Sequence, residues 1–125
     1  MKSHTDLGQS KKLAEFLPLE SADLCHKCIG DESYDVIMRP YSEYYEKYKL
    51  LVISKDFNAI PCWSLAALLD VLPDSTDIVK DKADTENEKY MCTVGVEHDI
   101  ISTFGNNPVD ACYDMITNLH KLSLS

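Results

Sequence analysis

The stretch that most constrains the fold is Ile60–Pro73, which is apolar over nearly its whole length. Only Ser64 and Asp70 are polar between residues 62 and 72, and the chain's single tryptophan, Trp63, stands near its start. A helix that is apolar nearly all round has to be buried on most sides. The stretch is also too short to span a bilayer, which takes about 20 apolar residues. The sequence therefore predicts one central buried helix over residues 60–73.

The size and composition of the chain are those of a folded protein. A chain of 125 residues is expected to form a single domain, residues 1–125, in which residues 1–8 are a flexible start. A chain of this length buries roughly two thirds of its unfolded surface, enough for a core without metal or disulfide support. Hydrophobic residues make up 45% of the chain and charged residues 26%, which argues against disorder.

The remaining predicted elements are helices separated by runs of strands. Apolar spacing and turn residues predict helices over 9–17 and 21–24, strands over 34–38, 49–54, 77–82, 89–96 and 98–104, and a C-terminal helix over 107–122. The short connection from Val96 to Asp99 predicts a hairpin. This order does not alternate as a parallel fold would. We therefore predict an α+β fold with an antiparallel sheet of about four to five strands, packed with helices on one face.

The C-terminal helix has the clearest signals in the chain. Asn107 is a favoured N-cap residue, and Pro108 suits the first helical position. Asp110 falls in the first turn, where a carboxylate complements the helix dipole. An apolar stripe follows at helical spacing, made of Val109, Cys112, Ile116 and Leu119.

The charge balance argues against nucleic acid and membranes as direct partners. The chain has 21 acidic and 12 basic residues, a formal net charge of −9, and its one arginine is Arg39. Binding to nucleic acid or to an anionic membrane needs positive charge at the contact surface, and no part of this sequence concentrates it. The acidic surplus leaves open a protein that mimics nucleic acid and binds a basic partner.

The cysteines indicate a reducing compartment. There are five, an odd number, and residues 1–6 lack the apolar run of a secretory leader. Cys62, Cys92 and Cys112 each lie in an apolar run, where a free cysteine packs as a small hydrophobic residue. We therefore expect a cytoplasmic protein with free thiols, and no cofactor is indicated.

Cys25 and Cys28 form the one motif with metal or thiol chemistry. Two cysteines at this spacing can bind zinc or form a redox pair. A structural zinc site needs about four ligands, and the other candidate ligands are scattered singly. We favour two structural cysteines near the end of a helix. The alternative is a small metal- or thiol-dependent enzyme that uses Cys25 and Cys28, although no nucleophile signature accompanies them.

A tyrosine-rich segment is the candidate partner-binding surface. It combines residue types that are enriched at binding hot spots, namely Arg39, Tyr41, Tyr44 and Tyr45. If the segment 41–48 is a helix, its rings share one face, although tyrosine also favours strands. The competing interpretation is that this face packs against the domain's own sheet.

Two segments of the chain resemble a known group of proteins. They are Ile60-Pro61-Cys62-Trp63-Ser64-Leu65, continuing to Leu72-Pro73, and Asn107-Pro108-Val109-Asp110-Ala111-Cys112. Together they resemble small uncharacterised proteins of Bacteroides-type gut bacteria and their phages or mobile elements. The resemblance implies a cytoplasmic protein of phage or mobile-element origin, and it implies no activity, because none is established for that group.

These observations favour a non-enzymatic module that binds an unknown protein partner. The small size, the acidic surface, the lack of a catalytic signature and the Arg39–Tyr45 segment all point in this direction. The alternatives are the thiol- or metal-dependent enzyme and the acidic nucleic-acid mimic. The sequence leaves the partner and the oligomeric state open.

Overall fold

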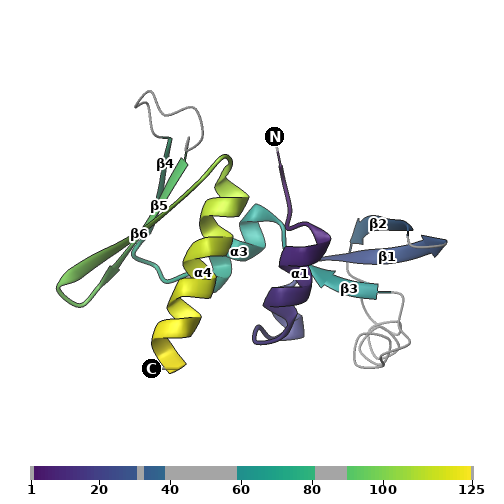
Figure 1. Ribbon diagram of the computed structural model, residues 1–125, viewed down its shortest axis with the longest axis horizontal. Coiled ribbons are helices and arrows are strands. Elements are labelled where there is room, and N and C mark those ends of the chain that lie inside the picture. The colour runs from purple at the N-terminus through teal and green to yellow at the C-terminus, as the bar shows by residue number, and fades with distance from the viewer. Residues whose placement is uncertain (1, 31–32, 39–58, 81–89, 125) are drawn as a thin grey trace. The chain divides into compact units, whose positions relative to one another are not determined.

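The computed structural model describes residues 2–30, 33–38, 59–80 and 90–124 of the chain (Figure 1). The chain divides into two compact units, one formed by Asp6–Ser64 and the other by Met1–Thr5 together with Leu65–Ser125. Each unit combines helices with an antiparallel sheet, so the predicted α+β class is confirmed. That the whole chain is a single domain stays a prediction.

The sheets differ from the one predicted. The described strands form two three-stranded sheets, with strand orders β2-β1-β3 and β4-β5-β6, and not one sheet of four to five strands. Every described strand pair is antiparallel, as predicted. The strand predicted over 49–54 lies outside the described residues.

The unit formed by residues 6–64 has one helix, a short 3-10 turn and three strands among its described residues. These are α1 (Leu7–Ala14), the 3-10 turn η1 (Leu19–Ser21), β1 (Leu24–Gly30), β2 (Ser33–Met38) and β3 (Ala59–Cys62). Helix α1 packs against β3, and β1 is the central strand of the sheet. The predicted strand over 34–38 is confirmed, but the short helix predicted over 21–24 is wrong, because β1 begins at Leu24.

The prediction of one helix over residues 60–73 is wrong in its first part. Residues Ala59–Cys62 form β3, which pairs with β1, and the helix α3 covers only Leu65–Val71. Pro61 suits the place of β3 at the edge of the described strands, since proline has no N–H to give to a second neighbour. Helix α3 is also not buried all round: Ala67 and Leu68 are buried, but Leu69 is 41% exposed.

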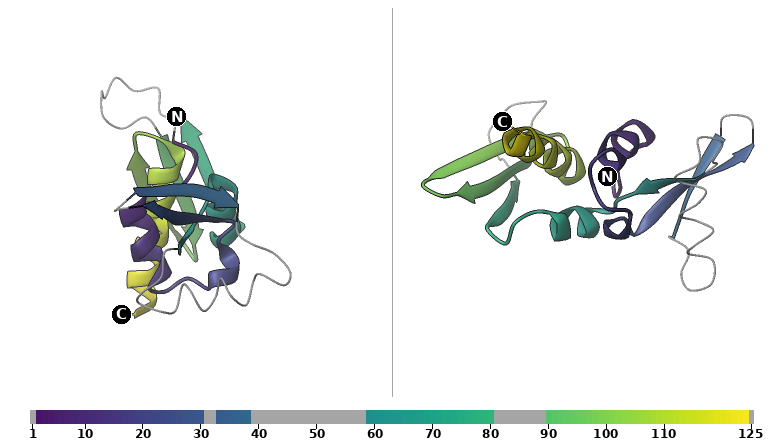
Figure 2. Two further views of the ribbon diagram at one scale, coloured as in Figure 1. Left: turned by 90° about the vertical axis from the view of Figure 1, so that its right-hand side faces the viewer. Right: turned by 90° about the horizontal axis from the view of Figure 1, so that it is seen from below.

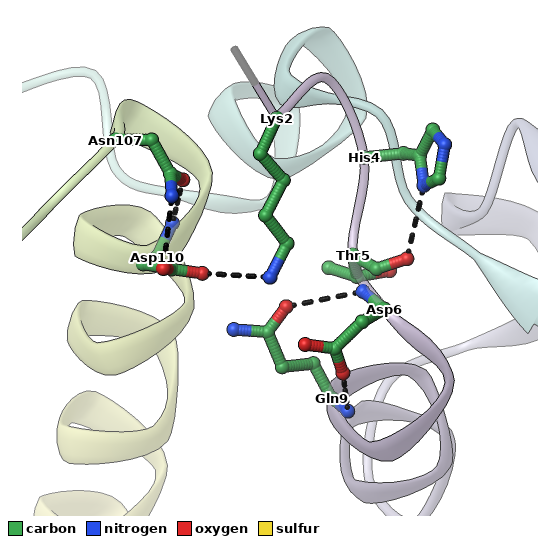
Figure 3. Close-up of polar contacts among 7 residues, drawn as sticks. All are labelled: Lys2, His4, Thr5, Asp6, Gln9, Asn107 and Asp110. Carbon is green, nitrogen blue, oxygen red and sulfur yellow. Dashed lines mark hydrogen bonds and ion pairs between the residues drawn. The ribbon is translucent and has the colours of Figure 1, made fainter.

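Helix α1 begins two residues before its predicted start because a capping box fixes it (Figure 3). The Asp6 side chain accepts a hydrogen bond from the Gln9 backbone N–H at 2.8 Å, and the Gln9 side chain accepts one from the Asp6 N–H at 3.1 Å. Two backbone donors that a helix start would leave unsatisfied are thereby paired. Lys11 and Lys12 lie in the last turn, where they complement the helix dipole.

Side-chain hydrogen bonds join the residues just before β1 to those just after β3. The Trp63 indole N–H donates to the Ser21 hydroxyl at 2.9 Å. Asp23 accepts from both the backbone N–H and the hydroxyl of Ser64. Trp63 is fully buried, so its indole needs such a partner. These bonds fix the position of the chain where β3 ends.

The other unit carries α3, a three-stranded sheet and the C-terminal helix. Its strands are β4 (Thr76–Lys80), β5 (Tyr90–Val96) and β6 (Asp99–Gly105), and its last helix is α4 (Pro108–Leu124). Helix α4 lies along one face of the sheet in the views of Figures 1 and 2, in contact with β5, β6 and α3. The predicted hairpin is confirmed: β5 and β6 pair continuously from Val96 and Asp99 to Tyr90 and Gly105.

The core of this unit follows the predicted stripe of α4. Val109, Cys112 and Ile116 of that stripe are buried, together with Met115, and so are Cys92 and Val94 of β5, which α4 contacts. Leu119, the last member of the stripe, is half-buried. Asn107 caps the helix as predicted: its side-chain oxygen accepts from the Asp110 N–H at 2.9 Å. Among the described residues, no helix combines the length and the apolar character needed to cross a bilayer.

Candidate functional sites

The predicted partner-binding residues Arg39, Tyr41, Tyr44 and Tyr45 all lie outside the described residues. Their role therefore stays a prediction. The described residues contain three other features with the potential for chemistry or binding. These are a buried histidine–cysteine pair, a buried pair of thiols and an uncovered sheet face.

Cys25 and Cys28 do not stand near the end of a helix, as predicted, but in strand β1. Cys25 is buried, with 1% of its surface exposed. The side chain of Cys28 lies outside those that the structure describes. The alternative of an enzyme that uses Cys25 and Cys28 therefore stays a prediction.

His26 and Cys62 form a polar pair beneath α1 that the sequence did not indicate. His26 on β1 pairs with Ile60, and Leu24 pairs with Cys62, so His26 and Cys62 lie diagonally on one face of the sheet. Their ligand-type atoms, an imidazole nitrogen and the Cys62 Sγ, are within 4.8 Å of one another. The His26 Nε2 is 3.1 Å from the hydroxyl oxygen of Ser10 on α1.

This pair is closed to substrates. His26 is 6% exposed, and Cys62 and Ser10 are fully buried. A thiol that attacks a substrate has to be reached by it. The hydrogen bond from Ser10 gives His26 the partner that a buried polar ring requires, so the cluster acts in packing α1 onto the sheet.

Cys92 and Cys112 form a second buried cluster, in the other unit. Both are free thiols with no exposed surface. Thr103 lies beside Cys92 in the register of β5 and β6, and its hydroxyl donates to the carbonyl of Ala111 at 2.7 Å. Cys112 is the next residue after Ala111 in α4. The hydrogen bond from Thr103 therefore holds Cys112 near Cys92, between β5 and α4.

The two thiols hold at most one negative charge between them. The hydrogen bond to Cys92, together with burial, raises the pKa of Cys112 well above that of an ordinary thiol. The same hydrogen bond lowers the pKa of Cys92, although burial acts against it. Cys112 therefore keeps its proton at physiological pH, and the pair contributes to packing more than to reactivity.

Lys2 joins the N-terminal residues to the start of α4 (Figure 3). Its ammonium donates to the Asp110 carboxylate at 2.9 Å, and the Asn107 side-chain amide donates to the other oxygen of the same carboxylate. The ion pair is partly exposed, so it contributes at most about 1 kcal/mol. Its use is to hold the segment 2–5 on this unit.

The face of the β4–β5–β6 sheet opposite α4 is apolar and uncovered by the described elements of its unit (Figure 2). We name it the open face. The strand register aligns Val79, Met91 and Phe104 in one row across the three strands. Ile100 is 75% exposed, Val79 is 49% and Phe104 is 39%. Between the apolar positions stand Asp77, Thr93 and Ser102.

A shallow hollow lies on the other side of this sheet. It has a volume of about 420 Å³ and is lined by Ile101 of β6 and by Asn118, Lys121 and Leu122 of α4. Leu122 is 55% exposed. The hollow is open to solvent and mostly apolar.

The sequence did carry a signal for the open face. In residues 99–105 both alternating sets of positions include an apolar side chain, so neither face of that strand is wholly polar. Antiparallel sheets with one solvated face normally show a polar set there. Comparisons of the chain with protein-family models, with curated proteins and with solved structures each found no match.

Proposed function

We propose that this chain is a non-enzymatic protein-interaction module whose contact surface is the open face. The observation that carries the proposal is the row Val79–Met91–Phe104, with the highly exposed Ile100 on the same face. Val79, Met91 and Phe104 are direct neighbours across the three strands, and contiguous exposed apolar side chains mark protein interaction sites. The buried thiols and His26 give less support to a catalytic role.

The occupant that fits this face best is an amphipathic helix of a partner protein. The opposite face of the same sheet already holds a helix, α4, which contacts β5 and β6. A sheet face of this kind packs a helix through an apolar stripe. The chain's net charge of −9, with Asp77 on the open face itself, favours a helix whose other positions are basic.

The test uses two synthetic helical peptides with leucine along one face. The remaining positions are lysine in one peptide and glutamate in the other. We expect the lysine peptide to shift the backbone NMR signals of β4, β5 and β6, and the glutamate peptide to bind far more weakly. Because opposite charges attract, binding of the lysine peptide should weaken as salt is added.

A matched pair of variants separates docking from plain charge attraction. Phe104→Ser removes a side chain that is 39% exposed on the open face, and Leu69→Ser removes one that is 41% exposed on α3. We expect the peptide's affinity to fall about tenfold with Phe104→Ser, as for an apolar contact at the centre of an interface, and to stay unchanged with Leu69→Ser. Equal affinity of both variants, or no binding by the parent chain, would contradict the proposal.

A further inference from the structure

Strand β6 has an edge that no other described strand occupies. It is the last strand in the order β4-β5-β6, and β5 is its only neighbour among the described residues. An edge strand presents a row of backbone N–H and C=O groups that can pair with another chain. The edge is seven residues long, from Asp99 to Gly105.

The residues of β6 do not protect this edge. Proteins block edges with lysine, proline, bulges or inward-pointing charges. Residues 99–105 contain no lysine and no proline, and their register with β5 has no bulge. The opposite edge of the sheet differs, because the shorter strand β4 carries both Asp77 and Lys80.

The sequence of β6 is complementary to itself when two copies run antiparallel about Ser102. Ile100 then lies opposite Phe104 of the second copy, twice by symmetry, and both side chains are on the open face. Asp99 lies opposite Gly105, so no like charges meet directly across the pair. Apolar cross-strand pairs stabilise an antiparallel sheet, and Ile100 at 75% exposure has the most surface to bury.

The other side of the same edge continues the apolar surface. Ile101, which faces α4, lines the hollow together with Leu122, and Leu122 is 55% exposed. In the register centred on Ser102, Ile101 lies opposite Thr103 of the second copy. A second β6 therefore adds contacts on both sides of the sheet.

We propose that a second copy of this chain pairs along β6 and forms a symmetric dimer with a continuous six-stranded antiparallel sheet. The interface is isologous, so it closes and does not propagate into a fibre. The dimer also doubles the open face, but its formation does not depend on the docking of a helix there. Because each copy carries a net charge of −9, added salt strengthens this association.

The first test is sedimentation of the full chain at increasing concentration and salt, with two lysine variants. Ile100→Lys places a charge at the pairing edge, and we expect its dimer dissociation constant to rise about tenfold or more, because two apolar cross-strand pairs are lost. Val79→Lys places the same charge on the same face at the opposite edge, and it should leave the dimer intact. Both positions are exposed, so neither variant should unfold the chain.

The second test is a disulfide at the two-fold axis. Ser102→Cys puts two thiols opposite one another, at the Cα separation of about 4.5–5.5 Å that antiparallel pairs have and that a disulfide accepts. We expect a covalent dimer on mild oxidation with oxidised glutathione, whose own disulfide is reduced to two thiols as the new bond forms. The parent chain and Thr93→Cys, on the central strand, should stay uncrosslinked.

The outcomes separate this proposal from the helix-docking function. A parent chain that is monomeric at all concentrations, or a loss of the dimer with Val79→Lys equal to that with Ile100→Lys, overturns the β6 pairing. Salt acts in opposite directions on the two events, since it weakens binding of the basic peptide and strengthens the dimer. If the peptide fails to bind, the β6 dimer can still be shown by sedimentation, and if the dimer fails to form, helix docking can still be shown by the peptide.

Discussion

Gly105, the last residue of β6, has the least room for a side chain of the three glycines Gly8, Gly95 and Gly105. A Cβ atom placed there would lie 2.7 Å from the backbone nitrogen of Ala111 and 3.2 Å from the carbonyl oxygen of Asn107. Both are backbone atoms of the first turns of α4, so they cannot move without shifting the helix. The close approach holds the sheet and α4 at the distance at which Thr103 reaches the carbonyl of Ala111.

Gly105→Ala should therefore destabilise the fold. We expect the free energy of unfolding to fall by about 1–3 kcal/mol, the usual cost of forcing extra volume into a packed site. The control is Gly95→Ala on β5, where the nearest atom, the Ser75 Cβ, is at an ordinary 3.8 Å. Urea denaturation followed by circular dichroism measures both. If the two variants unfold at the same urea concentration, the close contact at Gly105 has no energetic weight.

At the scale of elements, the local signals of the chain predicted type better than extent. The C-terminal helix was predictable because Asn107, Pro108 and a regular apolar stripe agree with one another. The structure of the stretch 60–73 was not predictable in this way. Its first residues are apolar because they form a strand that pairs with β1, and their partners on β1 lie more than thirty residues earlier in the sequence. An apolar run alone does not distinguish a buried strand from a buried helix.

The start of α1 shows a signal that was present but overlooked. Asp6 and Gln9 have the three-residue spacing of a capping box, and the box fixes the helix start at Leu7. The candidate sites were harder to foresee. His26 and Cys62 meet only because two strands pair in one particular register, which the sequence does not state. The open face likewise depends on which side of the sheet α4 covers.

Helix α4 carries two aspartates one helical turn apart, Asp110 and Asp114, and the repulsion between their charges destabilises the helix. Partial burial, together with the charge of Asp110, raises the pKa of Asp114 above that of an ordinary aspartate. The folded chain thus holds this proton more tightly than the unfolded chain does. The stability contributed by Asp114 is greatest at low pH and is lost as the pH rises through the raised pKa.

Asp114→Asn should therefore stabilise the protein at about pH 7 and not at about pH 3, where aspartates are mostly protonated. The side chain is largely exposed, so the gain at neutral pH should be small, about 0.2–0.5 kcal/mol. Thermal unfolding at the two pH values measures it, with Asp70→Asn on α3 as a control for the general effect of removing one charge. A gain for Asp114→Asn that is the same at both pH values would rule out this explanation.

At the scale of the whole molecule, the buried thiols are natural reporters of how the chain unfolds. Cys25 and Cys62 are buried in the unit of residues 6–64, and Cys92 and Cys112 are buried in the unit that contains α3 and α4. Each unit has its own sheet and its own core. A buried thiol reacts with an alkylating reagent only when the structure around it opens.

We expect the two pairs of thiols to become reactive at different urea concentrations. The reason is that each pair is protected by a separate core, and cooperative units of a protein open with free energies of their own. Pulse alkylation followed by peptide mass spectrometry assigns each modified cysteine directly. Leu68→Ala, which creates a cavity where α3 packs against α4, should advance the labelling of Cys92 and Cys112 while leaving that of Cys25 and Cys62 unchanged. If all four thiols are labelled together in the parent chain and in the variant, the 125 residues unfold as the single cooperative domain that the length of the chain predicts.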